Sequence, residues 1–339
     1  MGSDLLQDIK YSVLDLAVIT EGQSPADAIH NSRDLAKQVE KMGYTRFWMA
    51  EHHNMENIAS SATSVLLGYV AEATDSIRIG SGGVMLPNHS PLIIAEQFGT
   101  LATLYPNRID LGLGRAPGTD KATAQAIRPD RMQQVRQFPN NVRQLQQYFS
   151  EHHNENTIRA VPGEGTNIPL WILGSSTDSA RLAAAMGLPY VFASHFSPQQ
   201  LDSALRIYRK EFQPSEQLDE PYVIPCVNVI AADTDKQAEW LATSFKQMFM
   251  GVVTGERKPM PPPVDDMNTV WNLQQKMAVK QMLTYSFIGS KETIKKELSD
   301  FVEETEADEI MIASYIYDHQ QRIKSHRLFA ELMQGKDGD

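Results

Sequence analysis

The chain has 339 residues, of which 42% are hydrophobic, and its formal net charge is −11. This apolar content suffices for a large core, while the negative charge without a basic stripe excludes a groove for nucleic-acid phosphates. The single cysteine, Cys226, cannot form an internal disulfide or a thiolate metal cage, and no apolar run approaches the ~20 residues of a membrane span.

The amino-terminal stretch MGSDLLQDIKYS contains no basic segment followed by an apolar one. This pattern is not that of a secretory signal peptide. Together with the use of only one cysteine, it leads us to expect a cytoplasmic protein.

Eight short apolar runs that are typical of buried strands alternate with helical segments. They are SVLDLAVI from Ser12, RFWMAE from Arg46, IRIGSGGVML from Ile77, RIDLGLG from Arg108, LWILG from Leu170, YVFASH from Tyr190, VIPCVNVIAA from Val223 and EIMIASYIY from Glu309. Their continuous apolar character suits strands that are covered on both faces, as in a parallel sheet.

The intervening segments carry helix start and stop signals. Ser-Pro pairs at Ser24, Ser90 and Ser197 each place a capping hydroxyl before a proline at the first helical position. The first helix is predicted to end at Gly43 and to bury one stripe of residues. That stripe comprises Ala28, Ser32, Leu35, Ala36, Val39 and Met42.

Strand and helix alternating eight times fit either a closed (β/α)₈ barrel or a doubly wound open sheet. The first four strands start at nearly constant intervals, near residues 13, 46, 77 and 108. This regularity, the count of eight and the chain length favour an α/β fold of the TIM-barrel type, a single domain over residues 1–339.

One region departs from this regularity. Residues 251–284 form an insertion after the seventh predicted strand and include GERKPMPPPVDD, in which four of five consecutive residues are proline. Proline removes backbone donors and fixes the backbone, so this segment cannot be a regular helix or strand. Because it follows a strand, we interpret it as an active-site lid, the alternative being a surface linker.

The tetrapeptide EHHN occurs twice, at residues 51–54 and 151–154. Active sites of (β/α)₈ barrels are built from the carboxyl ends of the strands. The first copy directly follows the strand RFWMA and is therefore predicted to carry chemistry. The second copy follows a polar helical segment and is predicted to lie at the surface.

Three interpretations compete for the first copy. A metal site is disfavoured, because adjacent histidines on an extended chain point in opposite directions and no HxH or HExxH spacing is present. The second interpretation is a histidine with a structural role, held by hydrogen bonds. The favoured interpretation is a general acid or base beside a cofactor, since the unperturbed pKa of histidine lies near neutrality.

Three further strand ends predict contacts with a flat cofactor that carries a phosphate. Gly82 and Gly83 permit close approach of a ring to bare backbone, although a simple bend of the barrel is an alternative. Arg115 is placed for a fork of hydrogen bonds to a phosphate. The sequence GSSTDSA from Gly174 places Ser176 and Ser179 on the first turn of a helix, where an anion is favoured, although an ordinary capped helix start would look the same.

Four segments, FWMAEHHN, IRIGSGGVMLP, RIDLGLGRAPGTD and PLWILGSSTDSARLAAAMGLP, resemble in order and spacing the bacterial luciferase-like flavin monooxygenase family. The resemblance runs from about residue 11 to residue 332 and is closest to the stand-alone oxidoreductases. It implies a (β/α)₈ barrel that binds reduced FMN at the carboxyl ends of its strands, usually as a dimer.

The resemblance also implies roles for individual residues. The catalytic histidine, which supports the reaction of reduced flavin with dioxygen, corresponds to His52, and the glutamate before it to Glu51. The non-prolyl cis peptide beneath the flavin ring corresponds to Gly82-Gly83.

The same resemblance implies the phosphate site. The arginine that binds the phosphate corresponds to Arg115, and the two hydroxyl residues correspond to Ser176 and Ser179. A glutamate that precedes them in the family is replaced by Ser175, which removes a charge beside the phosphate.

Two rival functions remain open: a deazaflavin-dependent oxidoreductase that transfers hydride without dioxygen, and a non-catalytic flavin-binding barrel. The retention of His52 argues against the second. We expect a flavin reductase as the supplier of reduced FMN and a small organic molecule as substrate. We also expect a homodimer through SSATSVLLGYVAEAT and LIIAEQFGTLATLY, because these helical segments have too little polar surface to face water.

Overall fold

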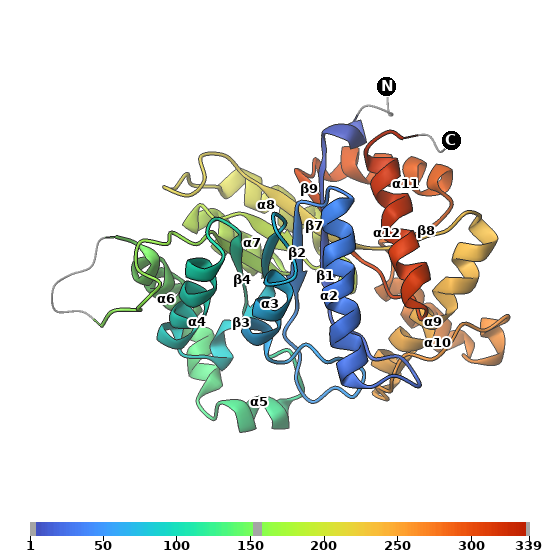
Figure 1. The fold of residues 1–339 in the computed structure, drawn as a ribbon, viewed down its shortest axis with the longest axis horizontal. Helices are drawn as coiled ribbons and strands as arrows, with labels where there is room; N and C mark the ends of the chain where they lie inside the picture. Colours follow the sequence, from blue (N-terminus) through green and yellow to red (C-terminus); the bar gives the residue numbers. More distant parts are fainter. Residues whose placement is uncertain (1–4, 152–157, 337–339) are drawn as a thin grey trace.

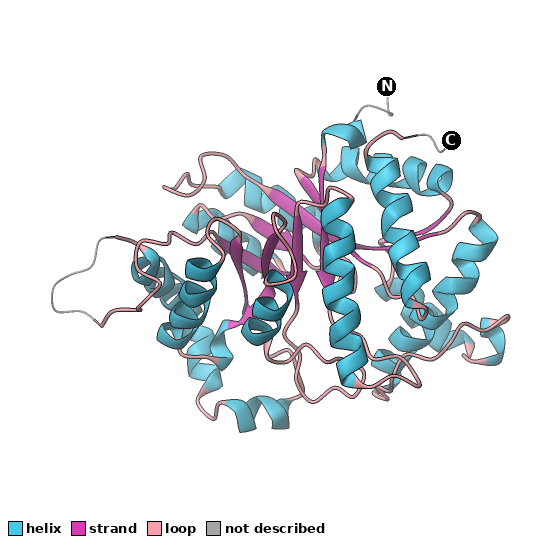
Figure 2. Cartoon of the chain, in the orientation of Figure 1, coloured by secondary structure: helices cyan, strands magenta, loops and turns pink. Residues whose placement is uncertain are grey.

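The computed structural model of the chain describes residues 5–151 and 158–336. Its parallel strands lie at the centre and its helices surround them (Figures 1 and 2). The strands are β1 (Lys10–Asp15), β2 (Arg46–Met49), β3 (Arg78–Met85), β4 (Ile109–Gly114), β5 (Leu170–Gly174), β6 (Tyr190–Phe192), β7 (Val223–Ala231), β8 (Ser286–Gly289) and β9 (Glu309–Ala313).

Eight of these strands close into a barrel. The order around it is β1, β2, β3, β4, β5, β6, β7, β9, and β9 returns to β1 with Lys10 opposite Glu309. The predicted (β/α)₈ barrel is therefore confirmed, and its eight strands are the eight predicted from apolar runs.

Eleven α-helices connect the strands within the described residues. They are α2 (Pro25–Lys41), α3 (Thr63–Ala71), α4 (Pro91–Leu104), α5 (Lys121–Ile127), α6 (Arg131–Phe149), α7 (Thr177–Met186), α8 (Leu201–Glu211), α9 (Asp235–Thr254), α10 (Leu273–Met282), α11 (Lys291–Thr305) and α12 (His319–Met333). Short 3₁₀ turns are η1 (Leu6–Asp8), η2 (Leu86–Asn88) and η3 (Met267–Thr269). None of the described helices is long and apolar enough to cross a membrane.

The strand β8 was not predicted. It pairs with the last four residues of β7, from Asn228 to Ala231, while β9 pairs with β7 from Cys226 to Asn228. The nine-residue β7 thus exchanges one neighbour for another along its length, and β8 lies outside the closed barrel. A run of four residues between two helices gives too weak a periodic signal to predict such a strand.

The helix signals were right in part. Ser24 accepts a hydrogen bond from the Asp27 N–H as predicted, and the predicted stripe on α2 is buried except for Met42. Ser90 precedes α4, but its side chain forms no capping bond. Ser197 does not begin a helix, because its N–H bonds to the Ala193 carbonyl in a turn and α8 starts only at Leu201.

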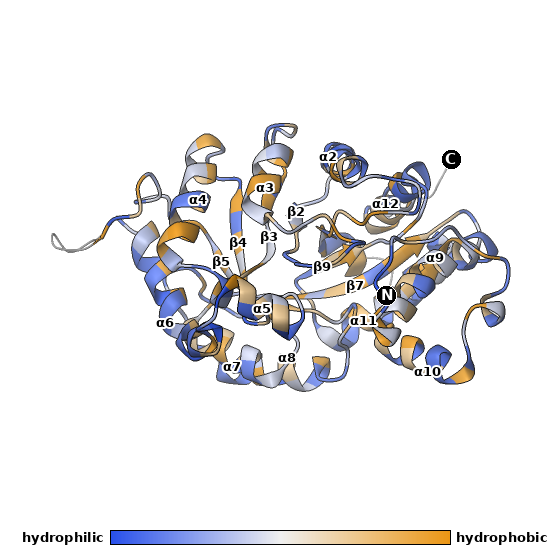
Figure 3. Cartoon of the chain, turned by 90° about the horizontal axis from the view of Figure 1, so that it is seen from below, coloured by the Kyte–Doolittle hydropathy of each residue, from blue (hydrophilic) through white to orange (hydrophobic). Residues whose placement is uncertain are grey.

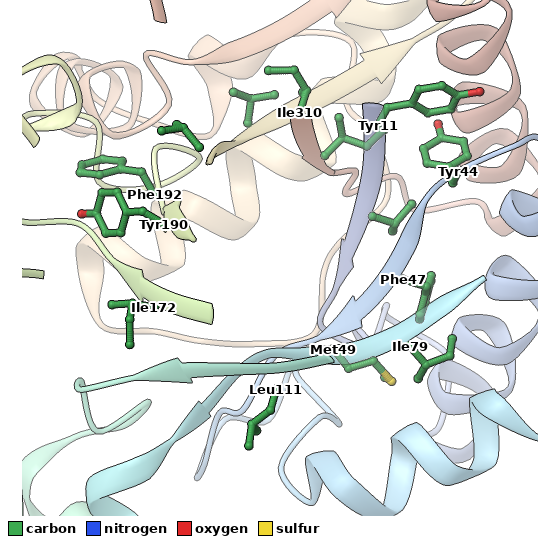
Figure 4. Close-up of a cluster of buried hydrophobic side chains, with 14 of the residues drawn as sticks. Tyr11, Tyr44, Phe47, Met49, Ile79, Leu111, Ile172, Tyr190, Phe192 and Ile310 are labelled. Atoms are coloured by element: carbon green, nitrogen blue, oxygen red, sulfur yellow. The ribbon is translucent and has the colours of Figure 1, made fainter. Parts of the chain in front are cut away.

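Side chains along each barrel strand alternate between two buried layers. Val13 and Phe47 belong to the layer between strands and helices, whereas their neighbours Leu14 and Trp48 belong to a second cluster that includes the barrel interior. The first layer is drawn in Figure 4, where Phe47, Ile79 and Leu111 project from adjacent strands. Both faces of the sheet are therefore covered, which explains why the strands lack polar alternation.

The amino ends of the strands hold a buried charge network, here called the barrel-floor network, of Arg46, Asp110, Glu309 and Arg78. The Arg46 guanidinium donates to Glu309 over 2.8 and 3.0 Å and to Asp110 over 2.9 Å. Arg78 donates to the other oxygen of Asp110, and the Trp171 ring lies 4.4 Å from the Arg46 guanidinium carbon. Each charge in this network has an opposite charge as its partner.

The insertion 251–284 contains the end of α9, an irregular segment, η3 and α10. The proline-rich part forms no regular helix or strand, as predicted. Its buried Met260 pairs with the loop after β1, donating to the Ile19 carbonyl and accepting from the Glu21 N–H, each over 2.9 Å. The middle of the insertion is therefore attached to the barrel, and a role as a lid stays a prediction.

Candidate active site

The predicted site residues lie within β3, at Gly82 and Gly83, and just after the carboxyl ends of β2, β4 and β5. Figure 3 shows the molecule from below, toward this end of the barrel, with α5 near the viewer. The first EHHN begins two residues after β2 ends. In the second copy Glu151 is exposed, and His152, His153 and Asn154 lie outside the described residues.

Glu51 is the centre of a buried hydrogen-bond cluster. Its carboxylate, 1% exposed, accepts bonds from the Met85 N–H over 2.8 Å and the Asn88 amide over 3.2 Å, and contacts the imidazoles of His53 at 2.7 Å and His89 at 2.9 Å. Burial opposes the charge, but the bonds to His53, His89 and Met85 outweigh it and lower the pKa of Glu51 to about 2.

This cluster joins the loop after β2 to the turn after β3. No group of three histidine, cysteine, aspartate or glutamate side chains among the described residues could hold a metal ion, although one carboxylate and two imidazoles meet here. With its oxygens already bonded to protein groups, Glu51 holds the loop that carries His52. Direct contact of Glu51 with a cofactor stays a prediction.

His52 lines a cavity of about 860 Å³ between the loop after β2, the segment before α5 and the insertion. Asn54, Thr119 and Arg257 are among the other lining residues. Burial lowers the pKa of His52 to about 4, and the charge of Arg257 adds to this effect. The imidazole is therefore neutral near pH 7, so it acts as a hydrogen-bond donor or acceptor rather than as a ready source of protons.

His195, three residues after β6, was not singled out from the sequence. It is 6% exposed, and burial lowers its pKa to about 3, with a contribution from the nearby His52. Its Nδ1, like that of His52, is buried without a hydrogen-bond partner. The available signal was its place at the end of YVFASH, where a strand turns toward the same barrel end.

The peptide between Gly82 and Gly83 is cis, as predicted, and the pairing of β3 with β4 shifts between Ser81 and Val84. A Cβ atom on Gly82 would lie 2.6 Å from Leu14 Cδ1, and one on Gly83 would lie 2.8 Å from the Gly112 carbonyl oxygen. Packing inside the barrel therefore already requires both glycines. A contact with a ring is compatible with this backbone but is not needed to explain it.

Arg115 follows the last residue of β4. Its carbonyl accepts a bond from Arg131 over 2.7 Å, while its exposed guanidinium has no hydrogen-bond or ion-pair partner among the residues that the structure describes. The register that sets Leu113 opposite Ile172 brings the ends of β4 and β5 side by side. Arg115 therefore lies near the start of α7.

The start of α7 is a capping box. Ser176 accepts a bond from the Ser179 N–H over 3.3 Å, and the buried Ser179 hydroxyl donates to the Ser176 carbonyl over 2.7 Å and contacts the Tyr190 hydroxyl at 2.8 Å. The Thr177 N–H donates a hydrogen bond to the side-chain carbonyl of Gln200. A contact of either hydroxyl with a phosphate stays a prediction, since Ser176 accepts from the Ser179 N–H and Ser179 is bonded to Ser176 and Tyr190. Ser175 is half-buried beside them.

The family model described as "Luciferase-like monooxygenase" matches residues 9–309. The chain belongs to this family. It is 51% identical to the "Luciferase-like monooxygenase" of Escherichia coli (strain K12) over 94% of this chain and 96% of that one. It is also 32% identical to the "N-acetyl-S-alkylcysteine monooxygenase" of Bacillus subtilis (strain 168), over 95% and 98% of the two chains.

Solved structures agree with this assignment. The crystal structure of apo-MsnO8 matches with a TM-score of 0.85 and 32% identity, covering 96% of this chain and 98% of that one. Members of the family are oxidoreductases, and this luciferase-like chain is therefore an enzyme of that class.

More distant barrels share the fold with different cofactors. A 3,6-diketocamphane monooxygenase component of Pseudomonas putida, solved with FMN, matches with a TM-score of 0.71, and an F420-dependent secondary alcohol dehydrogenase matches with 0.68; each is 16% identical. These two proteins therefore support the assignment of the fold. The fold alone does not select FMN or deazaflavin.

The residues present fit a phosphorylated flavin. The guanidinium of Arg115, without a partner among the described residues, follows β4, and α7 starts after the adjacent strand β5. Gly82 and Gly83 lie in the neighbouring strand β3. The Nδ1 atoms of His52 and His195 also lack partners among the residues that the structure describes. Arg115, Ser175 and Ser176 would hold the phosphate, and the bound group would supply redox chemistry with dioxygen.

Proposed function

We propose that this luciferase-like chain is a monooxygenase that uses reduced FMN and dioxygen to oxidise a small organic substrate. One oxygen atom enters the substrate and the other leaves as water, with the two additional electrons coming from the reduced flavin. The observation that carries the proposal is the unpaired guanidinium of Arg115 beside the start of α7, because a phosphate is the partner such a pair of elements recognises best.

The chain's own residues have separate tasks in this proposal. Arg115 and the serines at 175 and 176 bind the phosphate and so fix the position of the ring. His52, neutral near pH 7, offers a hydrogen bond to the reacting groups at the cavity. The Glu51 cluster keeps the loop of His52 in place. The insertion 251–284, which contributes Gly255 and Arg257 to the cavity, excludes water as a lid.

Titration of the purified protein with oxidised FMN, followed by quenching of flavin fluorescence, tests cofactor binding. Turnover is then measured with a flavin reductase that supplies reduced FMN, under air and under nitrogen. We expect binding and a dioxygen-dependent oxidation. Absence of FMN binding at micromolar concentrations would overturn the proposal.

A deazaflavin-dependent hydride transfer is the second candidate, supported by the F420-dependent dehydrogenase that shares the fold. It predicts tighter binding of F420 than of FMN, and substrate oxidation that proceeds equally well under nitrogen. The same titration with both cofactors separates the two candidates. A third outcome, tight FMN binding with no oxidation of reduced flavin beyond the free rate, would indicate a non-catalytic flavin-binding barrel.

The substrate class can be approached through the named relative. N-acetyl-S-alkylcysteine is a thioether that also carries a carboxylate, so a substrate panel would begin with thioethers of this kind. The cavity beside His52 contains both the apolar side chains Met55 and Ile58 and the polar Asn54, Thr119 and Arg257. Such a lining suits a small molecule with one apolar and one polar part.

We also propose a homodimer formed through α3 and α4. Val65 on α3 is 70% exposed, and Ile93 and Leu104 on α4 are 46% and 64% exposed. Apolar side chains gathered on two adjacent helices favour association with a second copy. Sedimentation at micromolar concentration should give the mass of a dimer, and Leu104→Glu should shift it toward a monomer. The wild-type chain sedimenting as a monomer would refute this interface.

A further inference from the structure

His52 and His195 lie at opposite sides of the barrel mouth. They follow β2 and β6, which are four strands apart in a closed ring of eight. Even so, the two side chains are close enough that the charge of one affects the titration of the other. The two imidazoles therefore lie near each other at the same end of the barrel.

The backbone that carries His195 is bound to the neighbouring strand β7. Its carbonyl accepts a bond from the Asn228 side chain on β7 over 2.6 Å, and the preceding Ser194 hydroxyl donates to the Cys226 carbonyl over 2.6 Å. The Phe196 ring meets the imidazole edge to face, with 4.7 Å between the centroids. The β7 bonds thus fix the backbone at this position, and the Phe196 ring restricts the imidazole.

The Nδ1 atoms of both histidines are nevertheless buried and without a partner among the described residues. An unsatisfied buried nitrogen is costly, and most buried polar atoms in native proteins have a hydrogen-bond partner. A polar molecule bound in the mouth would give each of these two atoms a partner.

We propose that His195 is a second active-site histidine, which hydrogen-bonds through Nδ1 to the polar edge of the bound flavin ring from the wall opposite His52. The inference rests on the proposed function, since it assigns residues of this chain to the same cofactor. It differs from a purely structural role, in which a buried water would satisfy His195 whether or not FMN is bound.

Titration of FMN into the wild type, His195→Phe and His195→Asn tests the inference by fluorescence quenching. Phenylalanine fills a similar volume but offers no hydrogen bond. The dissociation constant of FMN should therefore rise about fivefold, the factor that corresponds to the loss of one net hydrogen bond. Asparagine places an amide near the former Nδ1 and should keep the affinity within about twofold of the wild type. His30→Gln, at an exposed position on α2, is the matched control and should bind FMN as the wild type does.

A direct measurement on the wild type avoids dependence on the folding of the variants. Imidazole nitrogens of ¹⁵N-histidine-labelled protein are recorded before and after addition of oxidised FMN, with His52→Gln and His195→Asn supplying the assignments. We expect the Nδ1 resonances of both His52 and His195 to move. The Nδ1 resonance of the buried His326, which lies on α12 and contacts the Tyr44 hydroxyl, should stay in place.

The outcomes separate the two proposals. If FMN binds and the His52 resonance moves while that of His195 does not, or if His195→Phe binds FMN as tightly as the wild type, the inference is overturned and the proposed function stands. If the wild type does not bind FMN, both fall together.

Discussion

The two ends of the barrel treat buried polar groups in opposite ways. At the amino ends of the strands, the barrel-floor network pairs Arg46 with Glu309 and Asp110 and pairs Asp110 again with Arg78. At the carboxyl ends, the nitrogens of His52 and His195 lack partners, and Arg115 has no counter-charge among the described residues.

This difference separates groups that stabilise the fold from groups that await a ligand. A buried charge left unpaired would destabilise the folded state, so the barrel floor contains charges only where each finds a partner. A bound molecule can complete the unpartnered groups at the mouth, although Trp171 Nε1 near the floor also lacks a partner among the described residues. The carboxyl end is therefore expected to gain stability and order from cofactor binding, whereas the charges of the floor have their partners without it.

The largest expected effect concerns the floor. Arg46→Ala leaves the buried Glu309 carboxylate without its cationic partner and leaves Asp110 with Arg78 alone, which should lower the free energy of unfolding by about 3–5 kcal/mol. Arg115→Ala, at the other end, should change it by less than about 0.5 kcal/mol, because this guanidinium is exposed and unpaired. Urea denaturation of both variants measures the contrast, and equal losses would contradict it.

The second-largest expected effect is on FMN binding, where Arg115 matters more than it does for stability. Arg115→Ala should weaken FMN binding about tenfold to a hundredfold, since a charge-assisted hydrogen bond contributes roughly 1.5–3 kcal/mol. Arg181→Ala is the control, because Arg181 lies on α7 but faces Asp178 and Glu211 on the surface. Unchanged affinity of the Arg115 variant in a fluorescence titration would remove this residue from the phosphate site.

The next expected effect is a loss of stability at acidic pH caused by His52 and His195. Their folded-state pKa values, about 4 for His52 and about 3 for His195, lie below the ordinary value of 6.5. At pH values between the folded-state pKa and 6.5, each of these histidines binds more protons in the unfolded chain than in the folded one. The free energy of unfolding therefore falls as the pH drops below about 6.5. Glu51 acts at lower pH: its pKa is lowered from 4.5 to about 2, so its contribution is complete above 4.5 and is lost as the pH falls toward 2.

Denaturation at several pH values between 7 and 5 measures this dependence. His195→Asn should flatten the decline, because the group that must stay neutral is gone. A slope identical to that of the wild type would show that His195 does not titrate as a buried neutral imidazole. His30→Gln, at an exposed site, should leave the slope unchanged.

The smallest effect compares two helix caps. Ser176 caps α7 and Ser290 caps α11, each accepting a bond from a backbone N–H three residues later. Replacing either serine with alanine should lower the free energy of unfolding by about 1 kcal/mol. Only Ser176→Ala should also weaken FMN binding; an equal effect of Ser290→Ala would indicate that affinity follows helix stability and not a contact with the phosphate.

The local pattern of the sequence determined the architecture. Eight apolar runs and helix signals such as Ser24 before Pro25 predicted the barrel, because a strand covered on both faces and a capped helix depend mainly on neighbouring residues. The family motifs in addition predicted the cis peptide at Gly82-Gly83, which the structure contains.

Tertiary structure alone decided which polar groups have partners. That Ser179 bonds to Tyr190, that Glu51 meets His89, and that His195 approaches His52 depends on side chains between 11 and 143 residues apart in the chain. Only the closed ring of strands sets such residues side by side, since it brings β2 and β6 to one mouth. A hydrogen bond needs its two atoms within about 3 Å of each other, and spacing along the chain carries no information on that distance once the residues lie on different strands.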